Sequence, residues 1–266
     1  MRKQLIKLAL FISVVSFGQS EIKNKSNTNY AFKNGEWLKF RMSYSNFLNA
    51  GYSTIEVKEL KYNGKDAFHI IGNGKSTGLV SIFFKVKDDY QSYLYKETLQ
   101  PYRSIRKIDE GGYTKDQETI FDYSANEATV KNFKHNTETK HPITKNIQDI
   151  LSSLYYIRNQ KIRNLKINEE IELDMFFDDE INKFKLRFLG KEIVKTKFGK
   201  VKCLKFMPIV QAGRVFKEQE SVIVWISDDE NKIPLLIKAS LAVGSLRADL
   251  DAFKGLAHPF SILFNN

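Results

Sequence analysis

The stretch LKFRMSYS, residues 38–45, alternates hydrophobic and polar side chains without interruption. Its even-numbered residues are hydrophobic, and its odd-numbered residues are basic or carry a hydroxyl group. Successive side chains of a strand point to opposite faces, so this period of two predicts a strand with one buried and one wet face. Such strands are typical of antiparallel sheets.

The same alternation returns in the second half of the chain, in EIELDMFF at residues 170–177 and KFKLRF at residues 183–188. Turn-forming dipeptides lie between such runs, at Asn63–Gly64, Gly111–Gly112 and Asp178–Asp179. Gly, Asn and Asp readily adopt the backbone conformations that hairpins require. We therefore expect an all-β, mainly antiparallel protein whose curved sheet forms a barrel or half-barrel.

One segment has a helical period instead. Hydrophobic residues recur there at i, i+3, i+4, i+7 and i+8, at Ile147, Ile150, Leu151, Leu154 and Tyr155. We predict an amphipathic helix over residues 147–159, with Asn146 as its N-cap and Asp149 in its first turn. This helix would pack on the sheet and join an N-terminal to a C-terminal set of strands.

The first residues resemble a secretory signal peptide. Arg2, Lys3 and Lys7 precede a short apolar run, and small residues follow it up to Gly18. We predict a signal peptide at 1–18, a polar disordered leader at 19–30 and one β-rich domain at 31–266. No cysteine stands directly after the predicted cleavage point and the apolar run is too short to span a bilayer, so we expect a periplasmic or secreted protein without a lipid anchor.

The chain is basic, with 42 Lys and Arg against 31 Asp and Glu and a net charge of +11. Removing the three cations of the predicted signal peptide leaves +8. This charge favours an anionic envelope partner, such as a lipid head group or an acidic glycan. The lysines are dispersed and no nucleic-acid-binding module is recognisable, so we expect no nucleic-acid partner. The oligomeric state stays open.

Several motifs of chemical interest have simpler readings. Gly74–Gly78 matches G-x-S-x-G, but that nucleophile motif needs a helix after it, and residues 79–86 read as another strand. We therefore expect a glycine-rich hairpin loop. The four histidines form no metal-binding motif, so we expect neither a metal site nor a cofactor. The single cysteine, Cys203, is expected to be a buried structural thiol.

Acidic residues leave an enzymatic alternative open, because exported β proteins can cleave glycans with two carboxylates. The candidate carboxylates are Asp109–Glu110, Asp174, Asp178–Glu180 and Asp228–Glu230. Most of them occupy turn positions, where Asp is favoured for its local hydrogen bonds. No catalytic residue can be assigned from this pattern.

Motifs spread over nearly the whole mature chain resemble the exported bacterial family known as domain of unknown function 3108. They are Asn34–Phe40, Gly51, Phe83–Asp88, Pro101–Gly112, Asp149–Arg158, Phe198–Cys203, Val224–Pro234 and Val243–Ser245. The resemblance implies a shared fold and register. It brings with it no established reaction or ligand.

Within these motifs, Arg158 and the turn residues Asp228 and Asp229 form a candidate polar group. A helix that lies on the sheet would allow Arg158 to reach that turn. We expect a structural ion pair of Arg158 with Asp229, with a polar binding site as the alternative.

A curved sheet covered by one helix suits an apolar ligand or a partner's strand. We therefore expect a non-enzymatic binding, carrier or assembly factor of the cell envelope; the alternatives are a polysaccharide hydrolase or lyase and a purely structural or interaction module. The residues expected to line a binding interior are Trp37, Phe40, Met42, Tyr44, Tyr93, Phe121, Met175 and Trp225. The same residues would equally form an ordinary dry core.

Overall fold

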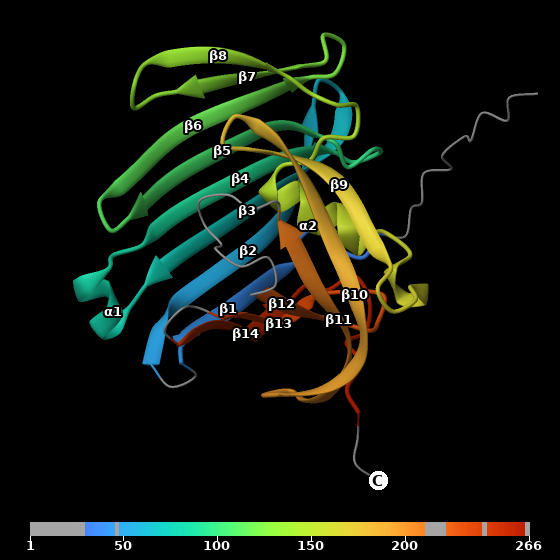
Figure 1. Ribbon diagram of the computed structural model, residues 1–266. Coiled ribbons are helices and arrows are strands. Elements are labelled where there is room, and N and C mark those ends of the chain that lie inside the picture. Colours follow the sequence, from blue (N-terminus) through green and yellow to red (C-terminus); the bar gives the residue numbers. More distant parts are fainter. Residues whose placement is uncertain (1–29, 46–47, 211–221, 241–243, 264–266) are drawn as a thin grey trace, which may run out of the picture.

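The computed structural model describes residues 30–45, 48–210, 222–240 and 244–263 (Figure 1). The predicted signal peptide and the leader up to residue 29 lie outside the described residues. The strands are β1 (Trp37–Tyr44), β2 (Leu48–Tyr62), β3 (Lys65–Ser76), β4 (Lys87–Tyr95), β5 (Pro101–Glu110), β6 (Tyr113–Asp122), β7 (Glu127–Asn132), β8 (Thr137–Pro142), β9 (Glu170–Phe177), β10 (Glu180–Thr196), β11 (Gly199–Val210), β12 (Val222–Ser227), β13 (Pro234–Ser240) and β14 (Ser245–Lys254). The helices are α1 (Gly78–Phe83), α2 (Ile150–Arg158) and the 3₁₀ turn η1 (Ile162–Asn164).

The described strands form one 14-stranded antiparallel sheet, so the predicted all-β, antiparallel architecture is confirmed. Strands β1 to β8 form one meander and β9 to β14 a second, and the two join where β1 pairs with β14. The sheet curls around α2 into a half-barrel (Figure 1). Its end strands β8 and β9 share no ladder within the described chain, so hydrogen bonds do not close the barrel.

The segment between β8 and α2 bridges this gap instead. The Ile143 amide donates to the Asn126 carbonyl at 2.9 Å, which ties the segment to the β6–β7 turn. The Gln148 amide donates to Asp174 and its carbonyl accepts from Phe176, at 2.9 and 2.7 Å. These bonds cover the exposed edge of β9, which would otherwise offer unpaired backbone groups to another chain.

The predicted hairpin turns are confirmed. Asn63–Gly64, Gly111–Gly112 and Asp178–Asp179 each join neighbouring antiparallel strands, and all six residues have positive φ. Two consecutive residues with positive φ are the signature of type I′ turns, whose twist matches that of the flanking strands.

The amphipathic helix is confirmed, but it begins later than predicted and Asn146 is not its cap. Asp149 is the N-cap: its carboxylate accepts from the Ser152 amide at 2.8 Å, and the Ser152 hydroxyl accepts from the Asp149 amide. Gln148 uses its backbone to pair with β9, so the chain is still extended there. Burial raises the pKa of Asp149 to about 6, although hydrogen bonds from Ser152 and Ser92 oppose the shift.

The expectation of a strand over residues 79–86 is wrong, because α1 occupies Gly78–Phe83. A short apolar run fits a strand or a helical turn equally well, and periodicity alone does not separate them. A helix does follow the Gly74–Gly78 motif, but the Ser76 hydroxyl accepts a hydrogen bond from the Val86 amide at 2.8 Å. Ser76 therefore fixes the connection between β3 and β4.

The helix α2 divides its hydrophobic side chains between the two halves of the sheet. Leu151 and Tyr155 pack with Phe68 and Ile70 of β3, whereas Ile157 packs with residues of β9 to β12. Cys203 is confirmed as a buried thiol, and burial raises its pKa to about 12. No helix of the described residues is long and apolar enough to cross a membrane.

The last residue of α2, Arg158, is fully buried and holds three parts of the chain together. Its two terminal nitrogens donate to the two carboxylate oxygens of Glu36, also fully buried, at 2.6 and 2.8 Å. One terminal nitrogen also donates to the Ala31 carbonyl, and Nε donates to the Asn231 carbonyl, each at 3.0 Å. Tyr155 adds a bond from its hydroxyl to Glu36 at 3.2 Å.

The expected ion pair between Arg158 and Asp229 is therefore wrong. Arg158 does reach the β12–β13 turn, but it contacts the backbone carbonyl of Asn231. Asp229 instead closes that turn by accepting from the Ser227 hydroxyl and the amides of Asn231 and Lys232. Asp228 pairs with Arg163 and Lys191, at 2.9 and 3.0 Å.

We expect Glu36→Gln to lower the free energy of unfolding by about 3–5 kcal/mol, because it leaves the Arg158 charge buried without a counterion. The double variant Glu36→Leu/Arg158→Met should recover most of the loss, since it removes both charges and keeps apolar volume. Urea denaturation followed by circular dichroism measures both effects.

Asp66→Asn is the matched control, since it breaks an exposed ion pair with Lys61. Exposed pairs contribute little to stability, so its midpoint should stay at the wild-type value. A Glu36→Gln midpoint equal to that of this control would show that the buried pair does not hold the fold together.

A candidate ligand groove at one end of the half-barrel

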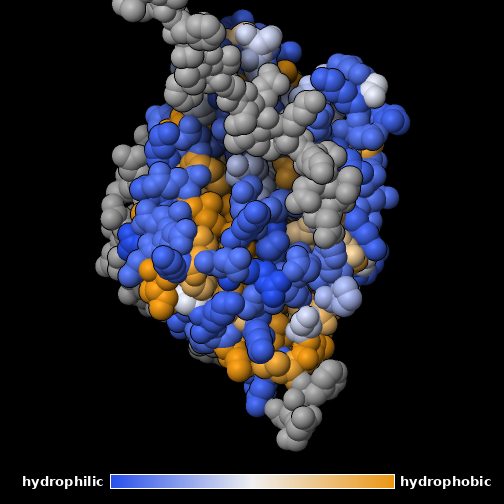
Figure 2. Space-filling model, turned by 90° about the vertical axis from the view of Figure 1, so that its right-hand side faces the viewer, coloured by the Kyte–Doolittle hydropathy of each residue, from blue (hydrophilic) through white to orange (hydrophobic). Residues whose placement is uncertain are grey.

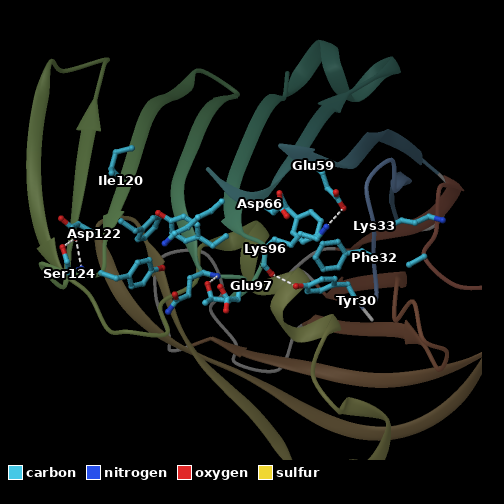
Figure 3. Close-up of a pocket in the computed structure, with 18 of the residues that line it drawn as sticks. Tyr30, Phe32, Lys33, Glu59, Asp66, Lys96, Glu97, Ile120, Asp122 and Ser124 are labelled. Atoms are coloured by element: carbon cyan, nitrogen blue, oxygen red, sulfur yellow. Dashed lines mark hydrogen bonds and ion pairs between the residues drawn. The ribbon is translucent and has the colours of Figure 1, made fainter. Parts of the chain in front are cut away.

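An open groove of about 1260 Å³ lies at the end of the half-barrel where β3 begins (Figure 3). Its walls come from parts of the chain far apart in sequence: residues 30–33, the turns that follow β2, β4 and β6, and Ala257–His258. Figure 2 faces this end, where hydrophilic residues cover most of the surface and hydrophobic residues show between them in patches.

Aromatic rings form the floor of the groove. Phe32 lies against Phe68 with ring centroids 4.9 Å apart, and Tyr30 stands edge-on to Phe68 at 5.6 Å. Phe121 and Tyr123 contribute from the β6 side. Phe32 and Phe68 are buried in the core beneath the groove, and the partly exposed rings of Tyr30 and Tyr123 lie above them. The floor therefore rests on fixed side chains and is preformed.

The charged side chains of the rim are largely engaged with one another. Lys96 donates to Glu59 at 3.0 Å, and its ammonium also lies 5.2 Å from the centroid of Phe68. The Lys65 ammonium lies over the Tyr95 ring at 5.4 Å. Asp122 accepts from the amide and hydroxyl of Ser124, and these bonds lower its pKa. Three lysines face four carboxylates, so the rim is nearly neutral.

The Arg158 network positions one wall of the groove. The backbone carbonyl of Asn231 accepts from Arg158. The side-chain amide of the same residue donates to the backbone carbonyls of His258 and Pro259, and its oxygen accepts from the His258 backbone amide. The His258 ring contacts the Tyr30 carbonyl at 2.9 Å. Burial, followed by the Glu97 carboxylate, raises the pKa of Tyr30, and its phenol donates to the Lys96 carbonyl at 2.6 Å.

Among the residues expected to line an interior, only Phe121 borders this groove. Trp37 lies under the Lys254 ammonium, and Tyr93 stacks on His69, on the sheet face opposite buried Leu94. The others lie elsewhere: Phe40 and Trp225 are in one core cluster with Met42 against it, Met175 is against another, and Tyr44 is beside Gly244. Whether any of them binds a ligand stays a prediction.

Sequence reasoning missed the residues that build the groove. Tyr30 falls at the end of the predicted leader, and Glu36 gave no sign of its partner because a lone glutamate next to a strand is normally exposed. The pattern that precedes β1, with Tyr30 and Phe32 flanking a small residue, was the available signal of a buried segment.

Four of the candidate carboxylates, Asp174, Asp178, Asp228 and Glu230, pair with cations. Asp174 pairs with Lys183, and Asp178 accepts from Arg106 and Lys115 at 2.8 and 2.6 Å. Although burial opposes the shift, hydrogen bonds from Lys115 and Arg106 hold the pKa of Asp178 below its ordinary value. Within the described chain, no group of three or more His, Cys, Asp or Glu side chains is arranged to hold a metal ion.

One carboxyl pair is different. Asp88 at the start of β4 is hydrogen-bonded to Glu110 at the end of β5, and its pKa is raised to about 6 by burial, by this bond and by the Glu110 charge. Carboxyls in direct contact share one proton. Glycoside hydrolases hold their two carboxyls roughly 5–9.5 Å apart to admit substrate or water, so this pair does not match that geometry.

We expect Asp88→Asn to stabilise the protein above pH 7 by about 1 kcal/mol, a figure discounted because the side chain is partly exposed to solvent. In the wild type, the raised pKa favours the folded state below about pH 4, and this contribution is lost as pH rises to about 6. Urea midpoints at pH 4.5 and 8 measure the difference. Glu110→Gln should reproduce it, and an equal gain at both pH values would contradict the shared proton.

The fold resembles solved structures at low sequence identity. A β-barrel-like protein of domain of unknown function DUF1849 from Brucella abortus matches with a TM-score of 0.55 and 8% identity, over 84% of this chain and 98% of that one. At this identity, the likeness shows the fold alone.

Two further solved structures are more distant. A Parabacteroides distasonis protein described as a lipoprotein matches with a TM-score of 0.38 and 12% identity, over 85% and 99% of the two chains. A Bacteroides fragilis protein described as exported, with a YmcC-like fold, matches with a TM-score of 0.33 and 10% identity, over 85% and 98%.

Among curated proteins, no match is found. The family model of a protein of unknown function, DUF3108, matches residues 39–251. This span begins within β1 and ends within β14, so it includes all or most of every strand of the sheet. The family resemblance expected from the motifs is confirmed, and the chain belongs to the DUF3108 family.

Proposed function

We propose that this protein is a non-enzymatic binding or carrier protein of the cell envelope, in the periplasm or outside the cell, and that it holds the apolar part of an envelope component in the groove. The observation that carries the proposal is the combination of a preformed aromatic floor with a nearly neutral rim. Ligand sites are typically concave, mostly apolar and equipped with a few polar groups that orient the ligand.

The size and charge of the groove favour an amphipathic ligand with a long apolar part. Its volume of about 1260 Å³ exceeds the roughly 300–1,000 Å³ of most small-molecule sites. Lys96 and Lys65 are engaged by a carboxylate and an aromatic ring, and the rim carries four carboxylates, so a purely anionic ligand such as an acidic glycan finds little attraction there. A lipid, with chains on the aromatic floor and a head group at the rim, fits both properties.

We expect protein purified from its own envelope to release a lipid in stoichiometric amount, detected by native mass spectrometry followed by denaturation and lipid analysis. A pyrene-labelled fatty acid serves as a binding probe in solution. Ser124→Trp places an indole in the groove from the exposed β6–β7 turn, and it should weaken probe binding at least tenfold.

The control is Thr137→Trp, which adds the same ring at an exposed position of β8 outside the groove. It should bind the probe like the wild type. The proposal would be excluded if the native protein carried no ligand and both variants bound the probe equally well. The aromatic rings under the groove would then be part of an ordinary packed core.

A further inference from the structure

The end of the half-barrel opposite the groove carries a concentrated apolar surface on α1 and the residue after it. Leu79, Ile82, Phe83 and Phe84 are 64%, 73%, 85% and 50% exposed. We call these four residues the apolar tip. Figure 1 shows α1 projecting beyond the ends of β3 and β4. Single exposed hydrophobic residues are common, but four within six positions mark an interaction surface.

Packing within the protein does not account for the apolar tip. None of the six residues of α1 is buried. A helix this short is unstable alone and normally depends on a buried face. Here it is held by short-range polar bonds: the Phe84 amide donates to the Val80 carbonyl, and the Ser81 hydroxyl to the Gly78 carbonyl, each at 2.7 Å.

The base of the apolar tip is anchored on the neighbouring β5–β6 turn. The Phe84 ring lies against Gly111, whose φ is +55° and where any Cβ would collide with the ring. The Gly111 amide donates to the Lys85 carbonyl at 2.8 Å. Tyr113, on the far side of this turn, is 55% exposed. The hydrophobic side chains are therefore presented from a fixed support.

Lysines flank the apolar tip on both sides in sequence. Lys75 precedes α1, Lys85 and Lys87 follow it, and all three are exposed. Within the described residues, no ion pair joins any of these three lysines to a carboxylate. Asp88, Asp89 and Asp109 line one cavity together with Lys75 and Lys87. These carboxylates are only partly exposed, whereas the lysines are exposed. The accessible charge around the apolar tip is positive.

We propose that the apolar tip docks this protein on the surface of an anionic lipid bilayer. The side chains of Leu79, Ile82 and Phe83 enter the boundary between head groups and acyl chains, and the lysines contact lipid phosphates. Short amphipathic elements bind membranes in this way, through buried apolar area combined with basic residues. Tyr113 would lie at head-group depth, where tyrosine is enriched. Docking does not require the groove to hold a ligand.

Flotation with lipid vesicles tests the proposal. We expect the full protein to float with phosphatidylcholine vesicles that contain 30% phosphatidylglycerol, and less with pure phosphatidylcholine or at 0.5 M salt. Ile82→Ser/Phe83→Ser should weaken vesicle binding at least tenfold, because each buried side chain contributes about that factor. Lys75→Gln/Lys85→Gln/Lys87→Gln should remove the preference for phosphatidylglycerol.

The matched control is Phe133→Ser/Ile167→Ser, which removes two hydrophobic residues that are 57% and 68% exposed elsewhere on the surface. It should float like the wild type, and all variants should keep the wild-type urea midpoint. Equal flotation of the two double variants would overturn the proposal, as would a wild type that binds no vesicles. Sedimentation velocity tests the alternative of self-association. A wild-type dimer that dissociates only in Ile82→Ser/Phe83→Ser would overturn the proposal.

Discussion

The buried pair of Arg158 and Glu36 is the interaction on which the arrangement of this protein depends. It joins the end of α2 to the segment before β1, and through the Asn231 carbonyl it also holds the β12–β13 turn. Removing two charges from water is costly, so a buried ion pair does not by itself make a protein more stable than apolar side chains of the same volume would. Its contribution is positional: any arrangement that separates the three segments leaves a charge buried without a partner.

This positional role explains how the groove keeps its shape. The backbone carbonyls of Ala31 and Asn231 both accept from Arg158. Ala31 lies between the groove residues Tyr30 and Phe32, and the side chain of Asn231 is bonded to the groove residue His258. The ligand groove is thus bounded by segments that the sheet alone does not fix. A single guanidinium, satisfied by a carboxylate and two carbonyls, sets their separation.

Much of the fold was predictable because it rests on local physics. Period-two alternation identified strands such as β1, β9 and β10, dipeptides with positive φ identified their turns, and the 3.6-residue period identified α2. The errors arose where distant partners decide the outcome. Asp149 caps α2 because the preceding residue, Gln148, is held extended by its backbone hydrogen bonds to β9. Glu36 is buried only because the Arg158 guanidinium lies opposite its carboxylate.

Most residues of the expected interior lie away from the groove for a related reason. Alternation tells which residues share a face but not which face is the concave one. In the middle of β11 both faces are buried: Cys203 and Leu204 are neighbours, point in opposite directions and are both inaccessible. Trp225 packs with Cys203 and Val194 on one side, while Ile226 packs with Leu204 on the other. An aromatic residue there is core on either face.

The pairing of β1 with β14 also constrains how the chain reaches its native state. Trp37 and Lys254 are partners in the central ladder although almost the whole chain lies between them. Closing so long a loop costs conformational entropy before its contacts form, so folding dominated by such pairings is slow. Until the last strand arrives, one edge of β1 beside the hydrophobic residues Leu38 and Phe40 has no neighbour. The edge of β1 is therefore covered only when the last strand of the sheet pairs with it.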